Sequence, residues 1–208
     1  MNLSEPLESL VGPVPAAVLR VLSRTDAGLS GRQVHAVAHA GSASGVNRTL
    51  GALARVGLVS VESRPPSLIY RPNRTHVLWA AVESALGARD RALDGIRLFL
   101  AEDAPDEVPA EWRVTAILYG SVARRTSTED SDVDVLLVFP DGYDDDSRAR
   151  LILGLAERIE ELTGSAAQVN PMDRGEFARR EMDGDDFLAN VLRDGIYLCG
   201  PRPEEWAC

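Results

Sequence analysis

Hydrophobic positions over residues 1–72 change from a helical spacing to a strand-like spacing. Apolar residues recur three and four apart over residues 15–22, which predicts a helix that ends before the loop at Gly28. Ser30 and Gln33 match a capping box, which predicts the start of a second helix. The apolar residues expected on the buried side of that second helix are Val34, Val37 and Ala38.

A third helix is predicted from about Ser42 to Val56, with Gly57 closing it. Its expected buried residues are Val46, Leu50 and Leu53. Residues 58–62 and 68–71 then read as two strands joined by a Pro-Pro turn at residues 64–67. This order of helix, helix, turn, helix and β-hairpin is that of a winged helix-turn-helix.

The passage from Val46 through Leu50 and Leu53 into Gly57-Leu58-Val59 resembles the step from recognition helix to wing in MarR- and ArsR-like regulators. The resemblance covers about 60 residues and implies a helix that enters the major groove of double-stranded DNA. A winged helix used only for protein contact or dimerisation is the alternative. The residues that the resemblance implies for DNA contact are Ser44, Asn47, Arg48, Arg55 and Arg64.

Residues 73–110 are predicted to form a connecting helix that breaks at Gly87 and ends at two prolines, Pro105 and Pro109. Apolar residues lie on one stripe, which either packs against a twin in a homodimer or covers the core of a second domain. The predicted domains are therefore residues 1–72, the connector 73–110 and residues 111–208. The residues of the expected stripe are Val77, Leu78, Ala81, Val82, Ala85, Leu86, Leu93, Ile96 and Leu100.

Residues 111–208 alternate between short apolar runs and amphipathic segments, which predicts an α/β fold with a small mixed sheet. A strand over residues 114–119 ends at Gly120-Ser121, where backbone N–H groups at the start of a short helix can bind a phosphate. The next buried strand covers residues 132–139 and opens with Asp132 and Asp134. Side chains two apart on a strand share a face, so these carboxylates can share divalent cations.

The run Leu118-Tyr119-Gly120-Ser121 and the run Ser131-Asp132-Val133-Asp134 together look like the signature of polymerase-β-type nucleotidyltransferases, with the small size of the minimal members. The resemblance extends loosely over residues 112–200. It implies that Asp132 and Asp134 are catalytic and carry Mg²⁺, and that the substrate is ATP or another NTP. The residues implied in nucleotide binding are Gly120, Ser121, Arg124, Arg125 and Ser131.

The resembled family expects a third carboxylate on a later strand, and Gln168 stands at the position that aligns with it. An amide neither accepts the acceptor's proton nor adds negative charge. Asn170 has the same defect, and Asp173 lies beyond Pro171, so it would need a bend to reach the site. Three functions remain open: transfer of an NMP to a hydroxyl of a protein or small molecule, a catalytically degenerate nucleotide-sensing or partner-binding transcription regulator, and an aminoglycoside nucleotidyltransferase.

Composition refines this interpretation in two ways. The 208 residues contain no apolar stretch long enough for a bilayer and begin with acidic rather than basic residues, so we expect a cytoplasmic bacterial or archaeal protein without a membrane partner. The net charge of −10 is unevenly distributed, with seven Arg against four acids in residues 1–72 and eleven Arg against twenty-one acids in residues 111–208. Two modules with different partners are therefore expected, as in an antitoxin-like regulator with a toxin partner.

Overall fold

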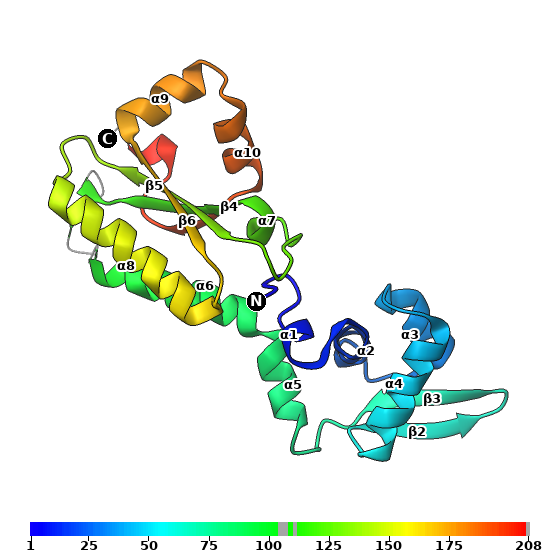
Figure 1. The fold of residues 1–208 in the computed structure, drawn as a ribbon. Coiled ribbons are helices and arrows are strands. Elements are labelled where there is room, and N and C mark those ends of the chain that lie inside the picture. The colour runs from blue at the N-terminus through cyan, green and yellow to red at the C-terminus, as the bar shows by residue number, and fades with distance from the viewer. Residues whose placement is uncertain (104–107, 110–111, 207–208) are drawn as a thin grey trace. The chain divides into compact units, whose positions relative to one another are not determined.

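The computed structural model describes residues 1–103, 108–109 and 112–206, so the prolines expected to end the connector fall partly outside the described residues. The chain divides into two units (Figure 1), one formed by residues 5–88 and the other by residues 1–4 together with residues 89–208. The division lies between Ala88 and Arg89, within the residues predicted to form the connector. In the part that is described, no helix is long and apolar enough to cross a membrane.

The unit of residues 5–88 contains three main helices followed by a β-hairpin. A short strand that the sequence did not predict pairs with the hairpin, so the antiparallel sheet has the order β1-β3-β2. The hairpin turns at Pro65 and Pro66, as expected. The elements in chain order are α1 (Glu8–Val11), α2 (Pro13–Ser23), β1 (Leu29–Ser30), α3 (Gly31–Ala38), α4 (Ala43–Arg55), β2 (Val59–Arg64), β3 (Ser67–Pro72) and α5 (Trp79–Leu86).

The predicted helix starts in this unit are confirmed at the level of single hydrogen bonds. The Gln33 side chain accepts a bond of 2.8 Å from the Ser30 backbone N–H, and the Gln33 backbone N–H donates to the Ser30 hydroxyl, which completes the capping box. Ser42 caps α4 by accepting from the Gly45 backbone N–H. The core formed by these helices and the sheet consists of Ala17, Val18, Val21, Leu22, Val34, Ala38, Val46, Leu50, Val59 and Tyr70.

Some of the predicted burial is wrong. Val37 is 54% exposed, because the short α3 buries only the row formed by Val34 and Ala38, four residues apart. Val77 and Leu78 are exposed because both precede α5, which begins at the buried Trp79. The expected break at Gly87 is confirmed, since α5 ends at Leu86 and a new helix begins at Ala88.

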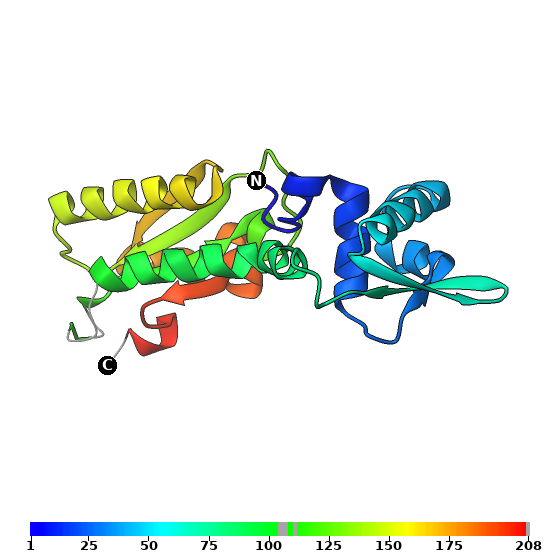
Figure 2. The same cartoon turned by 90° about the horizontal axis from the view of Figure 1, so that it is seen from below.

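The unit of residues 89–208 is a four-stranded mixed sheet with helices on both faces (Figures 1 and 2). Its strand order is β6-β5-β4-β7, in which β5 and β6 are parallel and the other pairs are antiparallel. The elements are α6 (Ala88–Asp103), β4 (Thr115–Tyr119), α7 (Gly120–Ala123), β5 (Val133–Phe139), α8 (Asp145–Thr163), β6 (Ala167–Asp173), α9 (Arg174–Met182), α10 (Asp186–Asp194), β7 (Ile196–Cys199) and the 3₁₀ turn Pro203–Glu205.

Alternate side chains of β5 lie on opposite faces of this sheet. Val133, Val135 and Leu137 pack with the buried rows of α6 and α8, whereas Leu136 and Val138 pack with α9 and α10. The apolar row Leu93, Ile96 and Leu100 of α6 belongs to the first of these cores. That placement favours the second reading of the predicted connector, in which its helix covers the core of the C-terminal unit.

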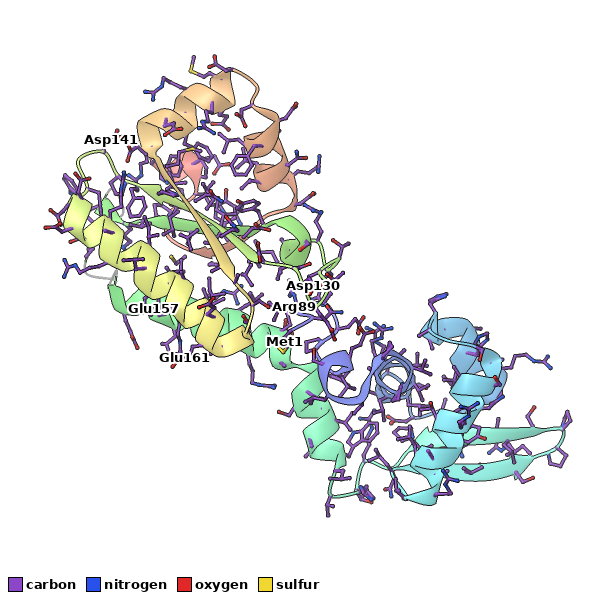
Figure 3. All side chains as sticks on the ribbon, in the orientation of Figure 1. Met1, Arg89, Asp130, Asp141, Glu157 and Glu161 are labelled. Carbon is purple, nitrogen blue, oxygen red and sulfur yellow. The ribbon has the colours of Figure 1, made fainter. Side chains whose placement is uncertain are left out.

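The loop between α7 and β5 is held from two sides by segments that flank residues 5–88. The Ser4 backbone N–H donates to the Ser127 hydroxyl (3.0 Å), and the Ser127 backbone N–H donates to the Ser4 hydroxyl (2.9 Å). The buried Arg89 guanidinium donates from Nη2 to the Val122 carbonyl of α7 at 3.1 Å. Figure 3 labels Met1 and Arg89 near this loop, which also carries Asp130.

Replacing Ser127 with alanine is expected to loosen this loop. The variant removes one of the two acceptors of the Ser4 backbone N–H, the other being Asn2 Oδ1, and one of two paired hydroxyls, which destabilises the loop by about 1–2 kcal/mol. Hydrogen exchange measured by mass spectrometry over residues 126–131 should therefore be about tenfold faster than in the unaltered chain. Thr126→Ala, which alters an exposed hydroxyl in the same loop, is the control. Equal exchange in both variants would show that the Ser4–Ser127 pair does not hold the loop.

Candidate active site

The candidate site lies where β4 ends and β5 begins. These strands are antiparallel, and Tyr119, the last residue of β4, pairs with Asp134 near the start of β5. The next residue, Gly120, has φ of +72° and lies so close to Asp134 that a Cβ atom at position 120 would collide with the carboxylate. Glycine is therefore needed here for both its backbone angle and its missing side chain. The structure brings together the Gly-Ser turn and the second predicted aspartate.

Burial and a neighbouring negative charge both disfavour the ionised form of Asp134. Burial raises the pKa of Asp134, the nearby charge of Asp132 raises it further, and the Arg124 guanidinium partly opposes both effects. Burial of the adjacent Tyr119 hydroxyl raises its pKa, and the charge of Asp134 raises that pKa further. A bound cation would relieve the repulsion between the two carboxylates.

Gln168 lies directly beside Asp134. In the parallel pair of β5 and β6, Asp134 is the register partner of Gln168, so the two side chains belong to the same face of the sheet. The Gln168 side chain is exposed at this sheet end. The position predicted to correspond to the missing third carboxylate is thus next to the aspartates, and an amide occupies it.

The two other candidates for a third site ligand do not replace a carboxylate. Asn170 donates a hydrogen bond of 2.5 Å from its amide to the Tyr119 hydroxyl. Asp173 pairs in register with Phe139 at the far end of β5 and forms an ion pair with Arg148. Five residues along a strand separate Asp173 from Gln168, a distance of roughly 17 Å. Asp173 therefore does not serve this site.

The structure separates the remaining predicted nucleotide-binding residues. Arg124 lines a pocket with Gly120, whereas Arg125 has φ of +58° and its charge acts on Arg89. The Ser131 hydroxyl accepts a bond of 2.9 Å from the Thr128 backbone N–H and so closes its own loop.

At the Gly-Ser turn, the backbone N–H groups are the possible phosphate donors, and the end of α7 adds little to them. Ser121 is half-buried, and its carbonyl accepts from the Thr126 backbone N–H at 2.9 Å, which folds the following loop back onto the turn. Because α7 has only four residues, the phosphate site expected from a helix end reduces to the backbone N–H groups of the turn itself.

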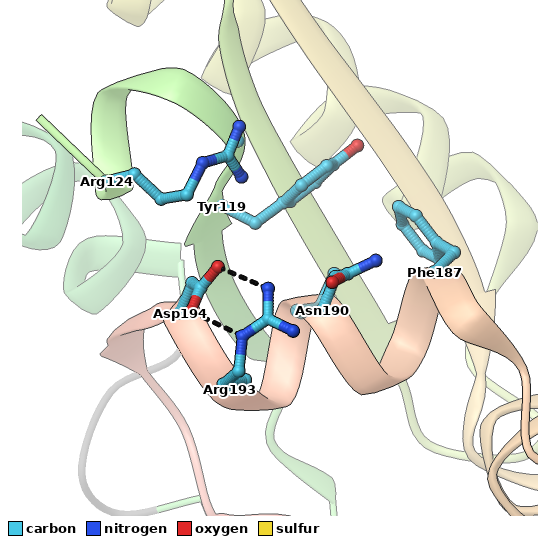
Figure 4. A pocket seen from close by; sticks show the side chains of 8 residues that line it. Tyr119, Arg124, Phe187, Asn190, Arg193 and Asp194 are labelled. Atoms are coloured by element: carbon cyan, nitrogen blue, oxygen red, sulfur yellow. Dashed lines mark hydrogen bonds and ion pairs between the residues drawn. The ribbon is translucent and has the colours of Figure 1, made fainter. Parts of the chain in front are cut away.

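Sequence reasoning assigned no residue of α10 to the site, although this helix forms the other wall of the pocket. A pocket of about 420 Å³ lies between the Gly120 turn and α10 (Figure 4). The Tyr119 and Phe187 rings meet edge to face with centroids 5.2 Å apart. Arg193 makes two bonds of 2.8 Å to the neighbouring Asp194 carboxylate. The available signal was the polar side of the amphipathic segment over residues 185–193. The α10 residues that line the pocket are Phe187, Asn190, Val191, Arg193 and Asp194.

Comparison with protein families agrees with this geometry. Residues 100–187 match the family model described as a nucleotidyltransferase domain, and the match spans β4, the Gly-Ser turn, β5 and β6. The C-terminal unit therefore contains a segment, residues 100–187, that is similar to a nucleotidyltransferase domain. None of the curated proteins matches the chain.

Two solved structures share limited similarity with the chain. A toxin–antitoxin crystal structure with AMP-PNP has 17% identity and a TM-score of 0.33, covering 52% of this chain and 76% of that one. TrmBL2, an archaeal chromatin protein with a novel mode of DNA binding, has 14% identity and a TM-score of 0.27, covering 84% of this chain and 70% of that one. Superpositions this weak do not establish a common fold.

The donor atoms of the nucleotidyltransferase domain suit one divalent cation. Asp132 and Asp134 supply carboxylate oxygens, and Gln168 can add a neutral amide oxygen, all of which are ligands that Mg²⁺ accepts. Among the described residues, no group of three or more His, Cys, Asp and Glu side chains is placed to hold a metal ion.

The residues predicted to contact DNA all have exposed side chains in the unit of residues 5–88. Ser44, Asn47, Arg48 and Arg55 lie on α4, and Arg64 lies at the end of β2, beside the hairpin turn. The Asn47 side chain also lies against Gly31, where a Cβ atom would collide with it. Arg64 donates from Nε to Glu62 at 2.7 Å.

Replacing Gln168 with aspartate is expected to strengthen cation binding by the nucleotidyltransferase domain. The added charge would lie beside Asp134 and give the site a third carboxylate, so the affinity for Mn²⁺, measured by calorimetry or electron paramagnetic resonance, should rise about tenfold. Asn170→Asp is the matched control, because it adds the same charge two residues along the same face of β6. An equal gain in both variants would mean that overall charge, and not direct coordination, sets the affinity.

Proposed function

We propose that the chain is a nucleotidyltransferase that moves an NMP from ATP or another NTP to a hydroxyl group of a protein or small molecule. The observation that carries this proposal is the contact between the Gly120 turn and Asp134, with Asp132 beside it. This arrangement places phosphate-binding backbone N–H groups next to a pair of cation-binding carboxylates. The family match over residues 100–187 supports the same activity.

In the proposed reaction the acceptor oxygen attacks the α-phosphorus of the NTP. The new P–O bond forms as the bond between the α-phosphorus and its bridging oxygen breaks, and pyrophosphate leaves. Mg²⁺, held by Asp132 and Asp134, would neutralise the charge of the triphosphate. Arg124 binds a phosphate oxygen through its guanidinium, and the turn at Gly120 and Ser121 orients the chain of phosphates. The acceptor's proton passes to water, because Gln168 has no basic oxygen.

Asp132→Asn and Asp134→Asn should each abolish nucleotidyl transfer. Each variant keeps the size of the side chain but removes one of the two charges that hold the cation. Label transfer from α-³²P-ATP should fall by at least about a hundredfold. The control is Asp141→Asn, which changes a carboxylate near the start of α9, at the other end of the sheet. Unchanged transfer in both site variants would contradict the mechanism.

The alternative is a regulator that binds a nucleotide without chemistry, and the amide at Gln168 is the observation that favours it. Calorimetry that shows ATP·Mg²⁺ binding, together with no pyrophosphate release over a broad panel of acceptors, would support this alternative. Transfer gained in Gln168→Asp would then indicate an enzyme that has lost its third carboxylate. The panel should include aminoglycosides, because polycations suit an acidic site.

We further propose that residues 5–88 bind double-stranded DNA as a winged helix-turn-helix and regulate transcription. The order of three helices followed by a hairpin supports this proposal, as does the exposure of the α4 residues Asn47, Arg48 and Arg55. The unit also has eight Arg against five acids, whereas the chain as a whole has a net charge of −10. An antitoxin-like pairing with a toxin, and a homodimer, stay predictions.

Arg48→Ala should weaken DNA binding in a salt-dependent way. Loss of one phosphate contact lowers the slope of log K against log salt concentration by about one, which fluorescence anisotropy with a mixed-sequence duplex can measure. Glu62→Gln should strengthen binding, because Glu62 ties up Arg64. Arg24→Ala removes the same charge at the end of α2 and is the control. An unchanged slope in Arg48→Ala would contradict this role for α4.

A further inference from the structure

Two arginines, Arg124 and Arg193, line the pocket beside the Gly-Ser turn, and the sequence motif includes only Arg124. Gly120 and Arg124 line it from the turn and its short helix, and Arg193 and Asp194 line it from the end of α10 (Figure 4). Its volume of about 420 Å³ is that of a small-ligand site. The pocket is therefore continuous with the turn that holds phosphate in the proposed function.

The Asp194 carboxylate holds the Arg193 guanidinium through two hydrogen bonds that a phosphate can replace. Its Nε and Nη2 atoms bond both oxygens of the adjacent Asp194 at 2.8 Å, and the Arg193 side chain is 66% exposed. An exposed ion pair of this kind contributes little to stability. A phosphate offers the same fork two charged oxygens, and such charge-assisted pairs are stronger. The exchange of carboxylate for phosphate therefore has a small cost.

Arg124 links this ion pair to the catalytic carboxylates. Arg124 lines the same pocket as Arg193, Asp194 and Gly120, and the Gly120 backbone lies against the Asp134 carboxylate. The Asp134 end of this line is where a cation and the α-phosphate belong in the proposed reaction. Arg193 lines the pocket from α10, on the wall opposite the Gly120 turn, and carries a cationic group suited to the remaining phosphates.

In the proposed function the turn at Gly120 orients the phosphates of the NTP, and we propose that Arg193 is a further residue, beside Arg124, that binds its β- and γ-phosphates. Asp194 orients the Arg193 fork and competes with phosphate for it. This inference rests on the proposed function and names the part of the substrate that the pocket recognises. The rival occupant is the nucleoside, which the rings of Tyr119 and Phe187 would contact. Those rings pack edge to face against one another, at 89°, and offer no parallel slot for a base.

The test is calorimetry on the full chain with Mg²⁺ and three probes: inorganic tripolyphosphate, ATP and AMP. Arg193→Ala should weaken the binding of tripolyphosphate and ATP about tenfold, which is the loss expected for one charged hydrogen-bonded contact. AMP, which lacks the β- and γ-phosphates, should bind within about twofold of the unaltered chain. Arg193→Lys should give an intermediate loss, because it keeps the charge and loses the fork.

Asp194→Asn provides an opposite prediction. It removes a negative charge that repels phosphate and releases the Arg193 fork, so the affinity for tripolyphosphate should rise about threefold or more. The control is Arg158→Ala on α8, which covers the other face of the sheet. Arg158 is also bonded to an acid on its own helix, Glu161, at 2.8 Å, so the control removes a similar ion pair. It should leave all three affinities unchanged.

Several results would overturn the inference. Failure of the unaltered chain to bind tripolyphosphate, or equal binding by Arg193→Ala, would remove the phosphate site. An equal loss of ATP and AMP affinity in Arg193→Ala would place the nucleoside in the pocket instead. Weaker tripolyphosphate binding in Asp194→Asn would also contradict the competition. Failure of the proposed function is distinguishable, because label transfer can be absent while tripolyphosphate binding follows the predicted pattern.

Discussion

The close approach of the Gly120 backbone to the Asp134 carboxylate is the constraint on which the candidate site depends. It follows from the antiparallel pairing of β4 and β5, which sets Tyr119 opposite Asp134 and so fixes the residue after Tyr119 beside that carboxylate. Any side chain at position 120 would push the carboxylate away. The hydrophobic residues of β5 bury the rest of the strand, so Asp134 cannot retreat into water without moving the sheet. The packed core therefore holds the Asp134 carboxylate against the Gly120 turn.

The loop that follows this contact is held by hydrogen bonds from other parts of the chain. The segment from Gly120 to Asp132 contains the turn, the short α7 and a polar loop, and only its residues Val122 and Ser127 are buried. Its stability comes from the reciprocal bonds between Ser4 and Ser127 and from the buried Arg89 at the Val122 carbonyl. Residues 1–4 and 89 stand on either side of residues 5–88 in the chain. The two covalent connections of the proposed DNA-binding unit thus lead directly to the segment that bears the proposed nucleotide site.

The secondary structure of both units could be predicted from the sequence because local signals and hydrophobic periodicity agreed. The capping box at Ser30 and the two prolines of the hairpin turn are local, and both were found. Burial at Val37 and Val77 was mispredicted, because periodicity gives the apolar side of a helix but not how much of that side a neighbour covers. The placement of Gln168 beside Asp134 followed correctly from the resemblance. The α10 wall with Arg193 did not, because it depends on how a distant helix packs across the sheet, and a polar helix side looks the same whether it faces water or a pocket.

The balance of charge around the site follows from the substitution at Gln168. Two carboxylates beside an amide carry one negative charge fewer than the three-carboxylate arrangement that the resemblance led us to expect. A site with less negative charge holds cations less tightly and repels a triphosphate less. Arg124 shifts the balance in the same direction, and in the proposed site Arg193 would do so once a phosphate displaced Asp194 from it. In the proposed function, an amide in place of the third carboxylate therefore weakens one requirement of catalysis, a basic group for the acceptor's proton, while it favours another, the binding of the anionic nucleotide.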